Sequence, residues 1–157
     1  MTKYRKVKTV EVQTERLRIV PCTRDFLSSR SDHYKIRPHI KSYLDNLDYD
    51  PDLVGWGVWI VITKTNDNMI GDIGFKGKPV DFQVEIGGGI LPHSQGFGYA
   101  TESIKGLINW AFSSEQVTTI KAECHASNKP SIRIMEKIDM VKVKEKNRFI
   151  NWELTRL

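Results

Sequence analysis

The amino-acid sequence predicts a mixed α/β fold of the α+β type, with mostly antiparallel strands. Short β-rich runs separated by turn residues fill the first half of the chain. After Gly98 the spacing of apolar residues changes to a helical period, and strands and helices then alternate. Two strand-like runs close the chain and predict a C-terminal hairpin.

The first half of the chain is predicted to form an antiparallel meander. Val10–Pro21 alternates β-branched and polar residues up to a proline, and Trp56–Ile62 is apolar enough for a central strand. Turn residues at 66–68 join this strand to Met69–Phe75 as a hairpin. The mixed segment between the first two strands is expected to hold two short helices and a loop, at Asp25–Ser29, Ile40–Leu47 and Asn46–Asp52.

The second half is predicted to run strand, helix, strand, helix before the final hairpin. Phe82–Leu91 alternates apolar and polar residues, which places Phe82 on the same buried face as Val84 and Ile86. Apolar residues at helical spacing predict an amphipathic helix over Gly98–Phe112. The remaining expected elements are a strand, a helix and two strands, at Thr118–Cys124, Asn128–Lys137, Met140–Lys144 and Phe149–Leu154.

Length and composition indicate one globular domain over residues 1–157, without internal repeats or low-complexity tracts. The longest apolar run is much shorter than the roughly 20 residues that cross a bilayer. The basic residues of Met1–Lys8 are not followed by the apolar stretch of a secretory signal. The two cysteines indicate neither a disulfide framework nor a CxxC metal site. We therefore expect a cytoplasmic protein with no membrane partner and no metal.

The net charge of +5 favours an anionic partner, either a phosphate-bearing cofactor or nucleic acid. Outside the short N-terminal cluster the basic residues are scattered, and no aromatic–basic RNA-binding motif is present. His33, His39 and His93 show no metal-ligand spacing. This pattern is more typical of a solvated surface than of a nucleic-acid groove.

The most informative segment is Ile90–Glu102, where a strand ends at a proline, a glycine-bearing turn follows and an amphipathic helix begins. Such a turn directs free backbone N–H groups and the positive end of a helix dipole toward one point, which suits an anion. Gly96 and Gly98 let the backbone approach a phosphate without a Cβ in the way. The segment has neither a P-loop pattern nor the third small residue of GxGxxG. A plain strand-to-helix turn is the alternative interpretation.

The loop Gln95–Ala100 matches the [RQ]xxGx[GA] pyrophosphate-binding pattern, and the chain resembles the GNAT acetyltransferases. Val84–Gly87 is similar to the strand before that loop, and Ala126–Lys137 is similar to the later N-x-x-S-I-x-x-x-E-K helix. Thr14–Arg18 resembles the opening strand of the branch that acetylates ribosomal-protein N-terminal alanines. The resemblance implies a mostly antiparallel central sheet flanked by helices on both faces. It also implies acetyl transfer from acetyl-CoA to a primary amine, on a protein N-terminus or a small molecule.

The same resemblance implies which residues hold acetyl-CoA. The backbone at Ile90 and Leu91 would pair with the pantetheine arm like an extra strand, and Asn128 would hydrogen-bond the amides of the arm. The glycines at 87–89 would permit a bulge that makes room for it. The pyrophosphate would lie on the loop residues Gln95, Gly96, Phe97, Gly98, Tyr99, Ala100 and Thr101.

An acceptor amine must lose a proton to attack the thioester, and the resemblance implies two candidate bases. Glu85 lies where several GNAT enzymes carry a strand carboxylate, and Glu123 lies where some peptide N-terminal acetyltransferases carry theirs. Either glutamate could instead be a solvated or ion-paired surface group. Many relatives use a helical tyrosine as the acid, but Met135 occupies that position here. Ser131 is the substitute candidate, with helix capping as its alternative role.

The sequence departs from the family pattern at two places. Asp139 replaces a glycine that often ends the last helix, which allows a different turn there, and His93 and Ser94 replace a common acidic–aromatic pair. The missing tyrosine and the altered turn keep a catalytically idle CoA-binding or interaction module as a rival function. Charge alone supports a second rival, a basic ribosome- or RNA-associated protein. The sequence specifies neither the acceptor nor the oligomeric state, although family members often form homodimers.

Overall fold

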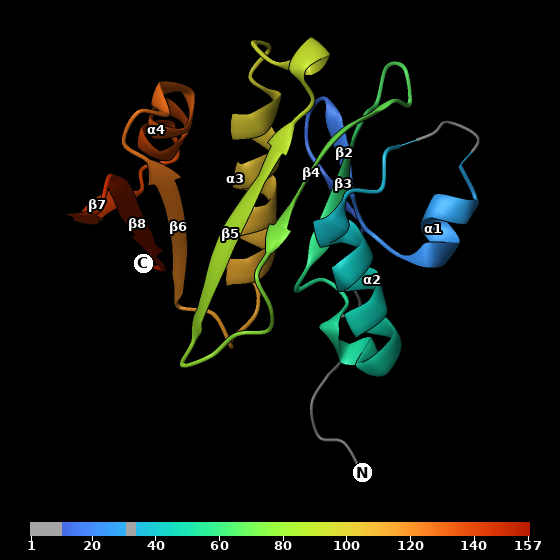
Figure 1. The fold of residues 1–157 in the computed structure, drawn as a ribbon, viewed down its shortest axis with the longest axis horizontal. Helices are drawn as coiled ribbons and strands as arrows, with labels where there is room; N and C mark the ends of the chain where they lie inside the picture. Colours follow the sequence, from blue (N-terminus) through green and yellow to red (C-terminus); the bar gives the residue numbers. More distant parts are fainter. Residues whose placement is uncertain (1–10, 31–33) are drawn as a thin grey trace.

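The computed structural model describes residues 11–30 and 34–157. The expectations that involve Met1–Lys8, Val10 and His33 lie outside these residues. Eight strands form a sheet in the order β1-β2-β3-β4-β5-β6-β8-β7 (Figure 1). Every neighbouring pair is antiparallel except β5 and β6, which are parallel. The mixed, mostly antiparallel fold predicted from the sequence is therefore confirmed.

Most elements lie within a few residues of their predicted positions. The strands are β1 Val12–Gln13, β2 Leu17–Pro21, β3 Val58–Thr63, β4 Met69–Phe75, β5 Gln83–Ile90, β6 Thr119–His125, β7 Val141–Lys146 and β8 Phe149–Thr155. The helices are α1 Arg24–Ser28, α2 Pro38–Tyr49, α3 Tyr99–Phe112 and α4 Lys129–Lys137, with short 3-10 turns η1 Pro51–Leu53 and η2 Pro92–Ser94. Among the described residues, no helix has the length and apolarity that a membrane crossing requires.

The single strand predicted over Val10–Pro21 is wrong, because the chain turns back within it. The N–H of Thr14 donates to the carbonyl of Leu17 at 2.9 Å, and the N–H of Leu17 donates to the Thr14 hydroxyl at 3.1 Å. β1 therefore pairs antiparallel with β2. The alternation changes phase at the turn: Val12 and Thr14 occupy even positions, whereas Leu17 and Ile19 occupy odd ones. The adjacent polar residues Glu15 and Arg16 were therefore a sign of the break.

Two further predictions are corrected. Part of the loop expected at Asn46–Asp52 is helical, because α2 continues to Tyr49. It ends just before Pro51, which has no N–H to donate to a continuing helix. Phe82 was expected on the buried face of β5, but its backbone is left-handed, with φ 63°, and its side chain is 60% exposed. The buried alternation therefore begins only at Val84.

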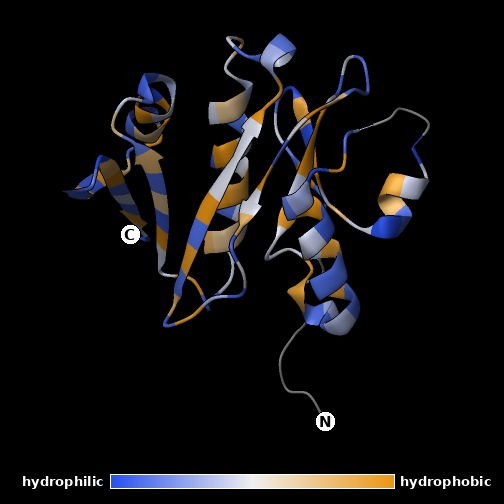
Figure 2. Ribbon diagram, viewed as in Figure 1, coloured by the Kyte–Doolittle hydropathy of each residue, from blue (hydrophilic) through white to orange (hydrophobic). Residues whose placement is uncertain are grey.

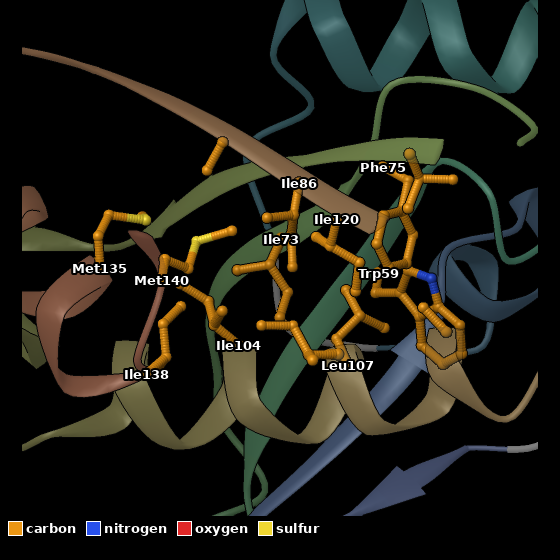
Figure 3. Packing of buried hydrophobic residues seen from close by; sticks show 14 of the residues in the cluster. Trp59, Ile73, Phe75, Ile86, Ile104, Leu107, Ile120, Met135, Ile138 and Met140 are labelled. Carbon is orange, nitrogen blue, oxygen red and sulfur yellow. The ribbon is translucent and has the colours of Figure 1, made fainter. Parts of the chain in front are cut away.

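The sheet is covered by α3 on one face and by α2 on the other, as the family resemblance implies. The larger core lies between the sheet and α3, where Ile104 and Leu107 point toward Ile73 and Ile120 (Figure 3). A smaller core lies under α2. Figure 2 shows apolar and hydrophilic residues alternating along β5, followed by a pale, glycine-rich stretch. Apolar burial on both faces is the main force that holds the helices to the sheet.

The parallel pair of strands sets the position of the site. β5 and β6 pair only from Gln83 opposite Thr119 to Glu85 opposite Lys121. β5 stays paired with β4 as far as Ile90, while β6 continues on its other side with β8. The two strands therefore separate toward their carboxyl ends, where α3 and α4 both begin (Figure 1).

The turn after α4 has the left-handed conformation that usually requires glycine, although Asp139 occupies the position. Asp139 has φ 64°, and its N–H donates to the carbonyl of Glu136 at 3.1 Å. The N–H of Met140 donates to the carbonyl of Met135 at 3.0 Å, which is the bond that closes a Schellman motif. Aspartate tolerates left-handed backbone better than most residues, so the motif survives the loss of the glycine.

This turn predicts a difference between two substitutions. A left-handed backbone costs an ordinary L-residue about 1–2 kcal/mol. We therefore expect Asp139→Val to lower the free energy of unfolding by about 1–2 kcal/mol, and Asp139→Gly to leave it unchanged or slightly higher. Urea denaturation measures both. Glu136→Val, in the regular part of α4, is the control, because it measures the cost of introducing a β-branched side chain without left-handed backbone. Equal stability of the valine and glycine variants at residue 139 would contradict the strain.

Candidate active site

The glycine-bearing loop leads from the end of β5 into α3. After η2, Gly96 and Gly98 both have left-handed backbone, with φ 86° and 82°. Gly98 is the N-cap of α3. A side chain would be strained at either position, so this path of the chain requires the two glycines.

The N-terminus of α3 has no side-chain cap within the described residues. The first hydrogen bond at this end joins the N–H of Glu102 to the carbonyl of Gly98 at 3.1 Å. The N–H groups of Tyr99, Ala100 and Thr101 precede it and have no intrahelical acceptor. These donors lie at the positive end of the helix dipole, which is the arrangement predicted for an anion site.

Gln95 stabilises the loop through a side-chain hydrogen bond to the preceding strand. Its side-chain amide donates to the carbonyl of Ile90 at 2.9 Å, and the N–H of Leu91 donates to Ile70 of β4 at 2.7 Å. The backbone groups expected to receive a pantetheine arm at Ile90 and Leu91 are therefore partly engaged. Peptide groups of alternate residues point to opposite sides of a strand, so those of Gly88 and Ile90 face the side from which β6 departs.

Arg16 holds the loop from the turn between β1 and β2, a role that the sequence did not indicate. Its Nη1 donates to the carbonyl of Phe97 at 2.9 Å, and its Nε donates to Glu102 at 2.7 Å. Its guanidinium lies 4.5 Å from the centre of the Tyr99 ring. The Arg16 N–H and the Thr14 hydroxyl donate to the second Glu102 oxygen at 2.8 and 2.5 Å. The resemblance of Thr14–Arg18 to the family is the sequence signal for this segment, but it predicts only a strand and not the contacts of Arg16.

These contacts change the acidity of Glu102. Burial alone would raise its pKa, but hydrogen bonds from Thr14 and from the backbone and side chain of Arg16 outweigh that effect. The pKa of Glu102 is therefore lowered from its ordinary value of 4.5. The hydrogen bond to Glu102 is the main cause that raises the pKa of Arg16.

The two candidate bases lie on the face of the sheet opposite α3. Val84 and Ile86 of β5 are buried in the core under α3, so Glu85 points to the other face. Its carboxylate pairs with Nζ of Lys76 at 2.6 Å. Glu123 is exposed on the same face of β6, beyond the last residue that pairs with β5. Glu85 is thus ion-paired, one of the roles that the sequence left open.

Asn128 and Ser131 lie at the start of α4. The Asn128 side-chain oxygen accepts the N–H of Ser131 at 3.2 Å, so Asn128 is the N-cap. Neither the Asn128 amide nitrogen nor the Ser131 hydroxyl makes a hydrogen bond within the described part of the chain. Cys124 is buried and accepts a hydrogen bond from the Trp152 indole at 3.3 Å, which fits a structural thiol.

A second polar cluster, which the sequence did not indicate, surrounds Asp72 of β4. This carboxylate is 3% exposed and accepts hydrogen bonds from the Tyr34 hydroxyl at 2.7 Å, from His39 Nε2 at 2.8 Å and from Arg37 Nη2. Burial, together with the hydrogen bond to Asp72, raises the pKa of Tyr34. Within residues 11–30 and 34–157, no group of three or more metal-ligating side chains is close enough to hold a metal ion.

The Acetyltransferase (GNAT) domain family matches residues 20–141, which include the diverging strands, the glycine loop and α4. The chain belongs to this family. The match covers most of the sequence, and it agrees with the motifs at Gln95–Ala100 and Ala126–Lys137.

The chain is also similar to curated proteins. It is 32% identical over 99 residues to the uncharacterised N-acetyltransferase YjdG of Bacillus subtilis, a match that covers 62% of this chain and 59% of that protein. It is 35% identical over 80 residues to the uncharacterised N-acetyltransferase YnaD of the same organism, covering 51% and 47%. The chain thus spans about half the length of the curated relatives it matches.

Solved acetyltransferase structures share the fold. The acetyltransferase from Agrobacterium tumefaciens superposes with a TM-score of 0.70 at 20% identity, over 99% of this chain and all of the other. The ribosomal-protein-S5-alanine acetyltransferase from Vibrio fischeri superposes with a TM-score of 0.68 at 14% identity, over 93% of this chain and 96% of that one. At these identities the likeness establishes a GNAT fold.

Glu102→Gln tests the contacts that hold the loop. Because the folded-state pKa of Glu102 lies below 4.5, its ionised form contributes stability that is complete above that pH and is lost as the pH falls through the folded-state value. We therefore expect a lower melting temperature than wild type at neutral pH, and a difference that shrinks below pH 4.5. Thermal denaturation across this range measures it. Glu115→Gln, at an exposed position, is the control. A difference that persists in acid would argue against the assigned hydrogen bonds.

Proposed function

We propose that the chain is an N-acetyltransferase that passes an acetyl group from acetyl-CoA to a primary amine by direct attack. The observation that carries this proposal is the uncapped N-terminus of α3, behind two left-handed glycines, at the point where β5 and β6 separate. The free N–H groups suit a diphosphate. The edge of β5 beyond its pairing with β6, where Gln95 occupies the Ile90 carbonyl, suits an extended arm that contains amides. Membership of the GNAT acetyltransferase family supports acetyl-CoA as the donor.

In this proposal the pyrophosphate lies against Gln95–Thr101 and receives the backbone N–H groups of the loop. A Cβ at Gly98 would lie 3.4 Å from Nη2 of Arg16. The Arg16 guanidinium therefore borders the same space and presents an oriented charge-assisted donor to it, while Glu102 balances its formal charge. Asn128 keeps its two amide donors for the pantetheine arm, because its oxygen alone serves as the helix cap.

The reaction then needs few groups. The amine nitrogen attacks the thioester carbonyl carbon, the carbon–sulfur bond breaks, and the CoA thiolate leaves. The amine proton passes to Glu85, or to Glu123 as the second candidate, directly or through a water. Ser131 is the candidate that donates a proton to the thiolate and recovers one from solvent.

Gly98→Val tests the cofactor loop, with Gly77→Val as its matched control. Both glycines have left-handed backbone, with φ 82° and 102°, and a Cβ at Gly77 meets no described atom within 4 Å. Both valines therefore incur backbone strain, but only the one at Gly98 occupies the place of the phosphate. We expect only Gly98→Val to abolish acetyl-CoA binding in calorimetric titration. Wild type should gain about 2.7 kcal/mol of stability at a hundredfold excess of ligand over Kd.

Two outcomes would count against this assignment. Unchanged binding by Gly98→Val would show that the loop has another role. A wild-type protein that neither binds acetyl-CoA nor gains thermal stability from it would remove the proposed function. Binding without turnover of any amine would instead favour a catalytically idle CoA-binding module.

Glu85→Gln tests the proposed base. Glutamine keeps the size of glutamate but cannot accept a proton, so we expect kcat to fall about 10²–10⁴-fold while acetyl-CoA affinity changes little. Most of an amine is protonated near neutral pH, so the loss should shrink at high pH, where free amine is abundant. Steady-state kinetics as a function of pH measure this. Glu123→Gln is measured in parallel. If Glu85→Gln behaves as wild type and Glu123→Gln loses activity, Glu123 is the base.

A further inference from the structure

The Asp72 cluster lies on the same face of the sheet as Glu85. Asp72 is opposite Ile60 of β3 and Gly89 of β5. Ile60 packs under α2, whereas the next residue of β4, Ile73, packs under α3. Because successive side chains of a strand alternate between its faces, Asp72 points to the side of α2 and away from the core under α3.

β5 offers no side chains between this cluster and Glu85. Gly87 and Gly89 occupy the two positions that point to this face. A Cβ built at Gly89 meets no described atom within 4 Å, and one at Gly87 meets only the Lys76 side chain, at 3.9 Å. We call this backbone, from Glu85 to Gly89, the glycine strip. At about 3.3 Å per residue it is roughly 13 Å long.

Arg37 and His39 contact Asp72, which lies opposite Gly89 at the end of the glycine strip, and both side chains are partly exposed. The side chain of Asp72 is 4% exposed, whereas those of Arg37 and His39 are 40% and 52% exposed. Arg37 uses Nη2 for its contacts to Asp72 and Tyr34. A guanidinium has five N–H donors in one plane, so its other edge remains able to bind a ligand.

The buried carboxylate has a use beyond stability. A buried ion pair adds little net stability compared with apolar residues of similar size. Asp72 does, however, fix the orientation of Arg37 from behind, and a donor that is already oriented loses less entropy when it binds a ligand. His39 is held by the same carboxylate, in the first turn of α2. The exposed edges of the cluster therefore favour an oxyanion.

We infer that the glycine strip receives the acceptor, and that Arg37, with His39, binds an anionic group on it, a carboxylate or a phosphate. This inference rests on the proposed acetyl transfer. With the amine near Glu85 or Gly87, the oxyanion lies roughly 7–13 Å away, at the rise of two to four strand residues. The acceptor class is thus an amine that carries a distant oxyanion, and polyamines are disfavoured because they have no acceptor for the oriented N–H groups of Arg37.

The test compares acceptors that differ only in charge. The series contains ω-amino acids of increasing length from ε-aminohexanoate to ω-aminoundecanoate, whose extended chains cover this range of distances, together with their amides and the corresponding aminoalkyl phosphates. With wild type we expect kcat/KM for the acid or the phosphate to exceed that for the amide by about tenfold or more at the best length, because hydrogen bonds to charged groups are the stronger ones. The preferred anion distinguishes carboxylate from phosphate.

Arg37→Met should abolish this preference by lowering kcat/KM for the acid to the value that the same variant shows for the amide, and Arg37→Lys should restore part of the preference. Arg24→Met is the matched control, because it removes an exposed arginine paired with Asp45 and Asp48. Arg37→Met alone removes one hydrogen-bond donor from the buried Asp72 carboxylate. The double variant Arg37→Met/Asp72→Asn removes the negative charge of that carboxylate as well. Thermal denaturation and acetyl-CoA titration verify that each variant is folded.

Two results would overturn the inference alone: equal rates for acid and amide in wild type, or an acid preference that survives in a folded Arg37→Met. Turnover of neutral amines would then still support acetyl transfer. Absence of turnover with every amine would overturn the proposed function, and this inference with it.

Discussion

The close approach of β4 and β5 at Gly88 is the constraint on which the rest of the site depends. Gly88 has φ 121°, and a Cβ there would lie 2.3 Å from the carbonyl oxygen of Asp72 and 2.5 Å from the Cα of Ile73. Gly71 faces β5 equally closely, since its Cβ would lie 2.4 Å from the Gly89 carbonyl oxygen. β5 can therefore stay paired with β4 as far as Ile90, while β6 stays paired with β8. The parallel strands β5 and β6 consequently separate after three residue pairs.

Segments far away in the sequence fix the loop and the start of α3 beside the point where β5 and β6 separate. Arg16 and Thr14, in the turn between β1 and β2, donate hydrogen bonds to Glu102 and to the carbonyl of Phe97, so the start of α3 is held from outside the helix. Gln95 ties the loop back to the strand that precedes it. Among the described residues no side chain caps the start of α3, so in the proposed function its backbone N–H groups would bind the ligand.

The local patterns of the sequence predicted most of the elements and the glycine loop, because periodicity and turn chemistry act over a few residues. They could not predict contacts between residues far apart in the chain. Thr14 and Glu102 are 88 residues apart, and Tyr34 and Asp72 are 38 residues apart. Phe82 fits the apolar period of β5, but its left-handed backbone is set by the turn before the strand.

The same long-range pairing explains why the charge pattern of the sequence is a weak signal of function. The scattered basic residues suggested a solvated surface, yet two of the arginines lie with their charges oriented by a more buried carboxylate. Arg16 is 42% exposed beside Glu102 at 19%, and Arg37 is 40% exposed beside Asp72 at 4%. One arginine borders the proposed cofactor phosphates, and the other borders the proposed acceptor. In each pair the formal charges cancel, so a count of charged residues cannot detect such an anion site. The oriented edge of the guanidinium nevertheless favours an anion. Anion recognition in this fold would therefore depend on how two neutral pairs are oriented, and not on the net charge of +5.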